Sequence, residues 1–281
     1  MENICVIGAG IMGSGIAQLA ATHGYNVNLV DINEEILNNS KNSIENNLER
    51  FFIAKGKLSK EEAFKILNRI NLINNLNDAT KNVQIVIEAV FEDMELKQKL
   101  FSELDSICDR TVILASNTSS LSITSIASKS KTKDRIIGIH FFNPAPVMKL
   151  IELIKGKETS EKIIKIAKEF SEELGKTVVL VNDSPGFVTS RLIYVMCNEA
   201  IKMKEEGIAS TKDIDTACKL AFNFPMGPLE LSDLVGLDIY YHIGQYLSKE
   251  FGDKYKPSPL INEMVRNNML GRKTKKGFYE Y

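Results

Sequence analysis

The chain has 281 residues, of which 44% are hydrophobic, so it can bury one large core or two cores in succession. Its 35 Lys and Arg residues nearly balance its 36 Asp and Glu residues, which argues against a nucleic-acid-binding protein and against an acidic tail. The four cysteines lie far apart without a C-x-x-C pair and no apolar run is long enough to span a bilayer, so we expect a soluble cytoplasmic protein with no disulfide framework, no metal site and no membrane partner.

The first predicted elements are a strand, a tight turn and a helix. Residues 4–10 form an apolar run that ends in glycines, and residues 11–24 continue with small and apolar residues at helical spacing. Gly8, Gly10 and Gly13 have the G-x-G-x-x-G spacing of a dinucleotide-binding turn, in which the glycines allow the turn, the approach of a pyrophosphate and close packing of helix on strand. The N-terminus of the helix would present free N–H groups to the phosphates.

The second predicted strand, NVNLVDI, ends near Asp31. An acidic residue about 20 positions beyond the glycines is where the hydroxyl groups of the adenosine ribose bind in dinucleotide folds. A carboxylate at this position would repel a 2′-phosphate, and no Arg follows it immediately. The sequence therefore predicts NAD(H) rather than NADP(H) as the cofactor.

A long polar segment follows at about residues 33–70 and has the pattern of helices. It is longer than an ordinary crossover between parallel strands, so it predicts a helical excursion from the sheet, broken near Gly56. Its lysines, Lys55 and Lys57 among them, either form a solvated face or meet a substrate that carries phosphate groups.

Strands and helices alternate again after this excursion. The strands are expected in VQIVIEAVF, TVILAS and RIIGIHFF, and the segments EAVFED, SNTSSLS and HFFNPAP follow or overlap their ends. This alternation predicts a Rossmann-type, mostly parallel sheet, and ligands bind at the carboxyl ends of the strands in such sheets.

The alternation stops after a helix at about residues 159–174 and a strand KTVVLV. Four helical stretches follow, at residues 187–207, 210–222, 227–252 and 258–270, and Pro185-Gly186 is the natural boundary. We therefore predict an α/β fold with a Rossmann-type NAD-binding domain at residues 1–184 and an all-α domain for substrate binding and dimerisation at residues 185–281. The many apolar positions of the second domain predict a homodimer.

The segment GIHFFNPAPVMKLIEL contains two apolar runs that are too close together to be parallel neighbours. Pro144 and Pro146 also exclude a crossover helix between them, so the second run should return antiparallel. In a hairpin centred near Pro146, His140 and Glu152 become direct cross-strand neighbours on one face. A carboxylate beside an imidazole orients the ring and stabilises its protonated form, which is the arrangement of a general base. Next to a nicotinamide, such a base predicts a dehydrogenase of secondary alcohols.

The chain also resembles a known family in motifs that run over essentially its whole length. These motifs are GAGIMGSGIA, EAVFED, SNTSSLSIT, HFFNPAPVMKLIEL, DSPGFVTSRL, FPMGPLELSDLVGLD and GRKTKKGFYEY. Together they resemble the L-3-hydroxyacyl-CoA dehydrogenase family, and within it the single-function bacterial enzymes acting on 3-hydroxybutyryl-CoA. The resemblance implies NAD(H)-dependent interconversion of a short-chain L-3-hydroxyacyl-CoA and the 3-ketoacyl-CoA, such as acetoacetyl-CoA, with His140 as general acid/base and Glu152 as its partner.

The resemblance implies roles for further positions. Ser119 would hydrogen-bond the substrate oxygen. Lys55 and Lys57 would interact with the phosphates of CoA. Beyond the glycines and Asp31, the implied cofactor-binding residues are Ile11, Met12, Glu92, Lys97, Asn117 and Asn143. Many relatives have Asn in the run Pro-Gly-Phe-x-x-Asn-Arg, where this chain has Ser190. A serine hydroxyl is shorter and lacks the fixed donor and acceptor of an amide, although it can still donate one hydrogen bond to the substrate.

Two other functions remain open at this point. A related fold uses the same glycine turn and His-Glu pair to oxidise sugar acids such as L-gulonate. A dinucleotide-binding protein without turnover is the third alternative, against which the joint presence of Ser119, His140 and Glu152 argues.

Overall fold

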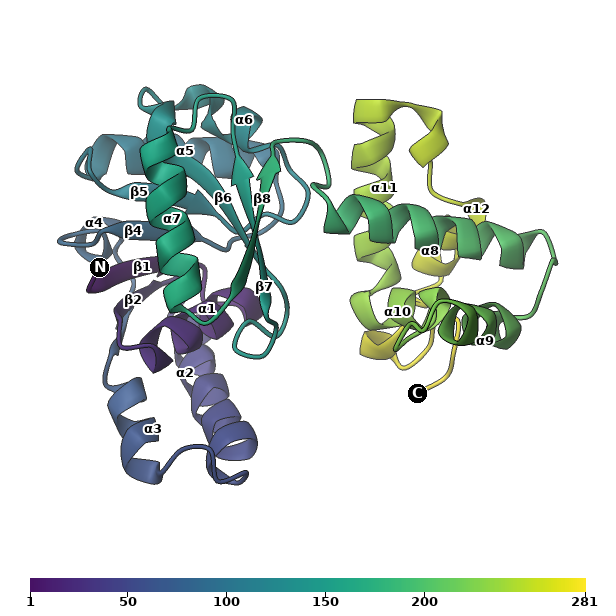
Figure 1. Ribbon diagram of the computed structural model, residues 1–281, viewed down its shortest axis with the longest axis horizontal. Helices are drawn as coiled ribbons and strands as arrows, with labels where there is room; N and C mark the ends of the chain where they lie inside the picture. Colours follow the sequence, from purple (N-terminus) through teal and green to yellow (C-terminus); the bar gives the residue numbers. More distant parts are fainter. The chain divides into compact units, whose positions relative to one another are not determined.

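The computed structural model describes residues 1–281, and the chain divides into two compact units, Met1–Ser184 and Pro185–Tyr281 (Figure 1). The first unit is a sheet with helices on both faces, and the second contains helices and no named strand. None of the helices combines the length and the apolarity that crossing a bilayer requires.

The sheet of the first unit has eight strands in the order β3-β2-β1-β4-β5-β6-β7-β8. Their bounds are β1 (Asn3–Ile7), β2 (Asn26–Val30), β3 (Ile70–Ile73), β4 (Ile85–Glu88), β5 (Ile113–Ser116), β6 (Ile136–Phe141), β7 (Leu150–Lys155) and β8 (Thr177–Asn182). The first six strands pair in parallel, β7 is antiparallel to β6, and β8 is parallel to β7. The predicted fold class, a mostly parallel sheet with an antiparallel end followed by an all-α domain, is therefore confirmed.

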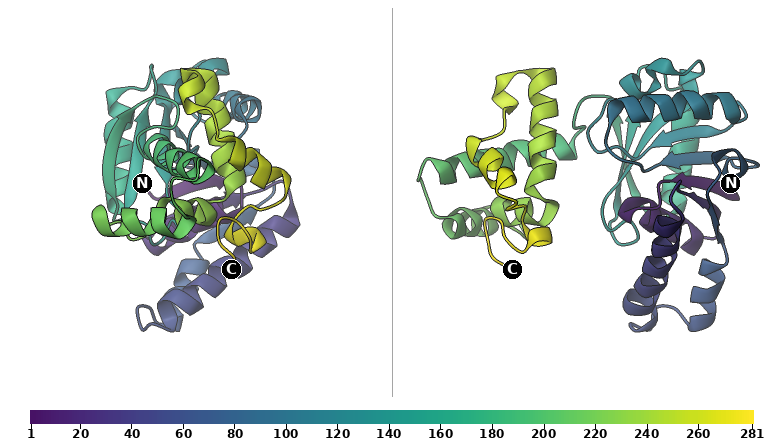
Figure 2. Two further views of the ribbon diagram at one scale, coloured as in Figure 1. Left: turned by 90° about the vertical axis from the view of Figure 1, so that its right-hand side faces the viewer. Right: turned by 180° about the vertical axis from the view of Figure 1, so that it is seen from behind.

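The helices of the first unit connect these strands. They are α1 (Ile11–Thr22), α2 (Glu34–Leu48), η1 (Glu49–Ile53), α3 (Lys60–Leu67), α4 (Leu76–Ala79), α5 (Met94–Ile107), α6 (Ile123–Ile126), η2 (Ala127–Lys129), η3 (Lys133–Arg135) and α7 (Glu161–Glu173). One large core joins α1, α2, α3 and α7 to one face of the sheet. Helix α5 crosses the other face, as the view from behind in Figure 2 shows.

The predicted excursion consists of α2, η1 and α3, which project from the sheet in Figure 1. Local capping explains its two main helices: the Asn33 side chain accepts from the first-turn amides of α2, and Ser59 and Glu62 form a capping box at α3. Strand β3 follows the excursion and was not expected from the sequence, because it is only four residues long and only partly buried.

The second unit contains the helices α8 (Thr189–Glu205), α9 (Thr211–Ala221), α10 (Pro228–Val235), α11 (Leu237–Phe251), η4 (Asp253–Tyr255), α12 (Pro259–Arg266) and η5 (Arg272–Thr274). The expectation of one helix at residues 227–252 is wrong, because Gly236 has a φ of 107° and separates α10 from α11. A residue in this conformation cannot continue a right-handed helix, and glycine adopts it without steric cost.

Two buried aspartates hold the C-terminal segment of the second unit in place. Asp233 accepts hydrogen bonds of 2.9 Å from the amides of Phe278 and Tyr279. Asp215 accepts from the hydroxyl of Tyr279 at 2.7 Å and from two amides at the start of α10. The chain end therefore packs against α9 and α10 through charge-assisted hydrogen bonds.

Arg135, immediately before β6, forms a buried ion pair with Asp105 of α5, with 2.8 Å between Nη2 and Oδ1. Burial acts to raise the pKa of Asp105, but hydrogen bonds from Thr132, Arg135 and two backbone amides outweigh it and lower this pKa to about 2. The ionised carboxylate is therefore more stable in the folded chain than in the unfolded chain. This pair fixes the start of the strand that carries His140.

Lowering the pH should decrease the free energy of unfolding of the wild type more than that of the Asp105→Asn variant. Because the folded-state pKa lies below the ordinary value of 3.8, the contribution of Asp105 is present above about pH 4 and is lost as the pH falls toward 2. The difference in unfolding free energy between the wild type and Asp105→Asn should shrink by about 2 kcal/mol over that range. Urea titrations from pH 5 to pH 2 measure it, and a constant difference would contradict the assignment.

Candidate active site

The turn between β1 and α1 has the geometry of a phosphate cradle. Gly8 has a φ of 95°, and a Cβ atom added there would lie 2.6 Å from the carbonyl oxygen of Ala89. A Cβ atom on Gly13 would lie 1.7 Å from the carbonyl oxygen of Gly8, whereas one on Gly10 would meet nothing within 4 Å. Two of the glycines are thus required by packing, and the third leaves open space beside the helix N-terminus, where a pyrophosphate could approach the backbone.

Asp31 lies directly after β2 and is tied to this cradle. Its Oδ2 atom accepts a hydrogen bond of 2.9 Å from the amide of Ala9, and its Oδ1 atom accepts one of 3.1 Å from the amide of Asn33. These bonds hold the carboxylate at the carboxyl end of the sheet while leaving it partly exposed. The position fits recognition of ribose hydroxyl groups.

Three large apolar side chains are exposed at this end of the sheet. Ile11 is 77% exposed, Ile32 96% and Phe91 86%, and they follow the ends of β1, β2 and β4. Such exposure at adjacent strand ends fits apolar surfaces for the rings of a dinucleotide. Ile32 and Phe91 were missed in the sequence, where their only signal is their place just beyond a buried strand. Met12, in contrast, is partly buried against the core.

The β6-β7 hairpin brings His140 and Glu152 together as predicted. The two residues are partners in the strand register, and Nδ1 of His140 lies 2.8 Å from Oε2 of Glu152. Both side chains are buried, and the ring of Phe142 lies 4.4 Å from the imidazole, between ring centres. An ionised carboxylate only accepts hydrogen bonds, so beside it Nδ1 of the imidazole is the nitrogen that carries the proton.

Two contacts hold this hairpin in place. Oδ1 of Asn117, just after β5, accepts a hydrogen bond of 2.9 Å from the amide of Phe141, which follows His140. Lys176 donates hydrogen bonds of 2.7 Å to the carbonyl oxygens of Ala145 and Met148 in the loop, and its burial lowers its pKa. Lys176 was not predicted, because a lysine beside a glycine at the end of a helix has no pattern that distinguishes it from a surface lysine.

Glu92, Lys97 and Ser119 also lie together. Oε1 of Glu92 accepts from the hydroxyl of Thr118 at 2.5 Å, and from the amide and hydroxyl of Ser119 at 3.0 and 3.3 Å. Nζ of Lys97 lies 3.3 Å from Oε2 of Glu92. The residues expected at the nicotinamide side and the residue expected at the substrate oxygen are thus parts of one hydrogen-bonded cluster.

Asp183, directly after β8, holds the segment that follows this cluster. Its carboxylate accepts hydrogen bonds of 3.0 and 2.8 Å from the amides of Ile123 and Thr124 and one of 2.7 Å from the hydroxyl of Ser122. The end of the first unit is therefore connected to the start of α6, a few residues beyond Ser119.

The other predicted residues belong to other segments of the chain. Lys55 and Lys57 are exposed in the turn at the tip of the excursion, where Nζ of Lys55 lies 5.5 Å from the ring centre of Phe51. Asn143 is exposed in the β6-β7 loop and precedes a cis peptide bond to Pro144. Ser190 belongs to the second unit, where it is buried in the first turn of α8.

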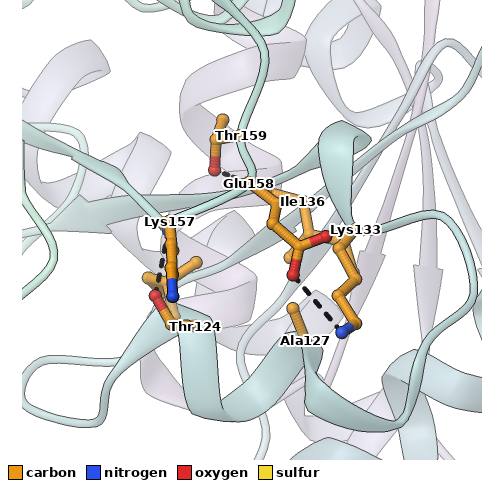
Figure 3. A pocket seen from close by; sticks show the side chains of 9 residues that line it. Thr124, Ala127, Lys133, Ile136, Lys157, Glu158 and Thr159 are labelled. Carbon is orange, nitrogen blue, oxygen red and sulfur yellow. Dashed lines mark hydrogen bonds and ion pairs between the residues drawn. The ribbon is translucent and has the colours of Figure 1, made fainter.

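A shallow surface hollow lies at the end of the β6-β7 hairpin away from its loop (Figure 3). Ile136 and Gly156 line it, together with an ion pair of 3.3 Å between Lys133 and Glu158. Ile136 begins β6, whereas His140 lies near its other end, and no predicted site residue lines the hollow, so the hollow is separate from the candidate site.

Two family models match the chain. The model described as "3-hydroxyacyl-CoA dehydrogenase, NAD binding domain" matches residues 3–184, and the model described as "3-hydroxyacyl-CoA dehydrogenase, C-terminal domain" matches residues 186–281. Together they account for almost the whole sequence.

Similar proteins and structures agree with these models. The 3-hydroxybutyryl-CoA dehydrogenase of Clostridioides difficile is 46% identical over 279 residues, covering 99% of each chain. The mitochondrial hydroxyacyl-coenzyme A dehydrogenase of Homo sapiens is 43% identical over 289 residues, covering 100% of this chain and 91% of the other. The crystal structure of (S)-3-hydroxybutyryl-CoA dehydrogenase from Ralstonia eutropha is similar with a TM-score of 0.95 and 43% identity, covering 100% of this chain and 99% of that one. The chain therefore belongs to the 3-hydroxyacyl-CoA dehydrogenase family and is an NAD-dependent enzyme of that family.

Proposed function

We propose that this enzyme interconverts L-3-hydroxybutyryl-CoA and acetoacetyl-CoA with NAD(H), and that His140 is its general acid/base. The observation that carries the proposal is the buried hydrogen bond between His140 and Glu152 at the carboxyl end of β6. The names of the Clostridioides difficile and Ralstonia eutropha relatives support the four-carbon substrate. The family assignment favours this acyl-CoA substrate over a sugar acid.

The mechanism follows from the side chains at this edge of the sheet. Bound NAD+ supplies the acceptor for the hydride that leaves the alcohol carbon. Nε2 of His140 takes the hydroxyl proton in the oxidation and returns it in the reduction. Glu152 holds Nδ1 as the donor and stabilises the imidazolium while the proton is on the ring. To donate a hydrogen bond to the substrate oxygen, the hydroxyl of Ser119 leaves its 3.3 Å bond to Glu92, while the amide of Ser119 keeps its own. Ser190, whose side chain is shorter than the asparagine common in the family, is proposed as a second substrate-binding residue.

The proposed cofactor site uses the residues at the ends of β1, β2, β4 and β5. The glycine cradle holds the pyrophosphate, Asp31 binds the adenosine ribose, and Glu92 and Lys97 bind on the nicotinamide side. The remaining proposed contacts are Ile11, Met12, Asn117 and Asn143.

A spectrophotometric assay tests the proposal. Purified protein is mixed with acetoacetyl-CoA, and the absorbance of NADH or NADPH is followed in separate reactions. Rapid oxidation of NADH with slow oxidation of NADPH is expected, because the Asp31 carboxylate would repel a 2′-phosphate. A parallel reaction with L-gulonate and NAD+ serves as the control. Turnover of the sugar acid without turnover of acetoacetyl-CoA would contradict the proposal.

Lys55 and Lys57 are proposed to attract the phosphates of CoA from the tip of the excursion. Both side chains are exposed, so the effect of Lys57→Ala is expected to be an increase in the Michaelis constant for acetoacetyl-CoA of up to about fivefold at low salt. The increase should shrink at high ionic strength, because salt screens exposed charges. Lys41→Ala on α2 is the control, and an unchanged Michaelis constant at every salt concentration would contradict the role.

A homodimer through the second unit is also proposed. Val188, Leu192 and Val195 are exposed and follow one another at helical spacing along the start of α8, and Leu220, Phe222 and Phe224 are exposed near the end of α9. Exposed large apolar side chains on neighbouring helices are typical of interfaces. Leu192→Asp is expected to convert a dimer into a monomer in light scattering, whereas Phe64→Asp on α3 should not. A monomeric wild type would contradict the proposal.

A further inference from the structure

Glu88, the last residue of β4, is fully buried and has no role in the mechanism above. Its Oε1 atom accepts hydrogen bonds from Nζ of Lys97 at 2.5 Å and from the amide of Val90 at 2.7 Å. Its Oε2 atom accepts one of 2.6 Å from the hydroxyl of Ser116. A buried carboxylate is costly unless an opposite charge and hydrogen bonds offset its desolvation, and Glu88 has both.

We infer that Glu88 is a positioning residue that holds Lys97, and through Lys97 and Glu92 the Ser119 turn, in the geometry that binds cofactor and substrate. This inference rests on the roles proposed above for Lys97, Glu92 and Ser119. Glu88 itself would touch neither ligand.

The first link is the ion pair between Glu88 and Lys97. Lys97 is 1% exposed, and its ammonium group has two carboxylate partners, Glu88 at 2.5 Å and Glu92 at 3.3 Å. Glu88 is closer to the Lys97 ammonium than Glu92 is, and it is more buried. Because opposite charges attract more strongly away from water, Glu88 is the stronger partner of Lys97. Glu88 is also held at both oxygens by neighbouring groups, so it fixes the position of Nζ.

The second link passes from Lys97 to the turn. The Glu92 side chain is 37% exposed, and a carboxylate at such a position has rotamer freedom unless its partners remove it. Lys97 binds Oε2 of Glu92, while Oε1 accepts from Thr118, Ser119 and Ser120. Because both oxygens belong to one rigid group, the position of the Lys97 ammonium determines where Glu92 holds the turn.

The contacts also explain why three separate segments meet at Glu88. Ser116 ends β5, Lys97 lies in the first turns of α5, and the amide of Val90 belongs to the loop between β4 and α5. The amide of Asn117 donates to the carbonyl oxygen of Glu88 at 2.8 Å, which ties the start of the SNTSS segment to the same residue. Glu88 thus joins β4, β5 and α5 beneath the proposed nicotinamide site.

The test is a double-mutant cycle read by NADH binding. Glu88→Gln, Lys97→Met and the double variant are titrated with NADH, and binding is followed by the fluorescence of the dihydronicotinamide. Each single variant should weaken binding by about 10- to 100-fold, the range that small misplacements produce. The double variant should bind no more weakly than Lys97→Met alone, because both substitutions break the same connection. It should also melt at a higher temperature than Glu88→Gln, since no buried ammonium is left poorly paired.

Two further variants separate positioning from general stability. Asp105→Asn breaks another buried ion pair of this unit and should lower the melting temperature without changing NADH affinity. Ser116→Ala removes one hydrogen bond to Glu88, and with it the acceptor of a 3.2 Å bond from the amide of Thr118, and it should weaken NADH binding in the same direction by a smaller factor. It provides a milder variant should Glu88→Gln fold poorly.

Two results would overturn the inference. Wild-type NADH affinity in Glu88→Gln, with only a lower melting temperature, would show a purely structural role. Multiplying effects in the double variant would show that Glu88 does not act through Lys97. Failure of the wild type to turn over acetoacetyl-CoA would overturn the proposed substrate alone, because NADH affinity is measured without an acyl-CoA.

Discussion

His140→Gln is expected to lower kcat for acetoacetyl-CoA reduction by about 10²–10⁴-fold, the usual contribution of a general acid/base. The glutamine amide can still donate a hydrogen bond to Glu152, but it does not release or accept a proton near neutral pH. NADH affinity should stay close to the wild-type value, because the glycine cradle and Asp31 follow other strands, β1 and β2. Steady-state kinetics and NADH fluorescence titrations measure the two quantities separately.

A second histidine provides the control for this substitution. His23 lies at the end of α1, where its Nδ1 atom is 2.8 Å from the carbonyl oxygen of Leu19 and its side chain is exposed. His23→Gln makes the same chemical change away from the hairpin and should leave kcat unchanged. If His140→Gln kept kcat within about tenfold of the wild type, His140 would not be the general acid/base.

Glu152→Gln should have an effect of similar size, about 10²–10⁴-fold in kcat, for a different reason. The neutral amide cannot stabilise an imidazolium, and its NH2 group can face Nδ1 and favour the tautomer with the proton on Nε2. His140 would then be oriented with the wrong nitrogen protonated. Nitrogen NMR of the His140 ring would report the tautomer directly, alongside the kinetic measurement.

The double variant His140→Gln/Glu152→Gln tests whether the two residues act as a unit. Its kcat should be no lower than that of His140→Gln alone, because residues of one catalytic unit are strongly non-additive. Glu173→Gln is the control. Glu173 ends α7 in the same unit and accepts a hydrogen bond from the hydroxyl of Tyr25, so this substitution makes the same chemical change away from the hairpin. Multiplying effects of the two substitutions would contradict the proposed pairing.

Local signals in the sequence account for much of this unit. The spacing of Gly8, Gly10 and Gly13 predicted a turn whose packing does require glycine at two of the three positions. The hairpin register followed from the turn near Pro146 and from the alternation of strand side chains, so the contact between His140 and Glu152 could be predicted. In both cases the residues that determine the contact are close together in the chain.

Strand β3 and the break between α10 and α11 could not be predicted from local sequence patterns. Strand β3 is short and half exposed, so it carries neither a long apolar run nor a clear alternation. The single helix expected at residues 227–252 was wrong because one glycine inside an apolar helical pattern is tolerated in many helices, and the backbone conformation of Gly236 depends on its surroundings.

The partners of Glu88 could be found only from the tertiary structure. In the sequence it stands inside the apolar run VQIVIEAVF, and no local pattern gives such a carboxylate a partner. Its partners come from β5 and α5, and only the assembled sheet brings Ser116 and Lys97 onto it. The sequence by itself determined the cofactor cradle, the hairpin pair and the order of the two domains, because periodicity and turn residues act over short stretches of chain. The tertiary structure alone decided the partners of the buried charges, because these pairs form between separate strands and helices once the core excludes water.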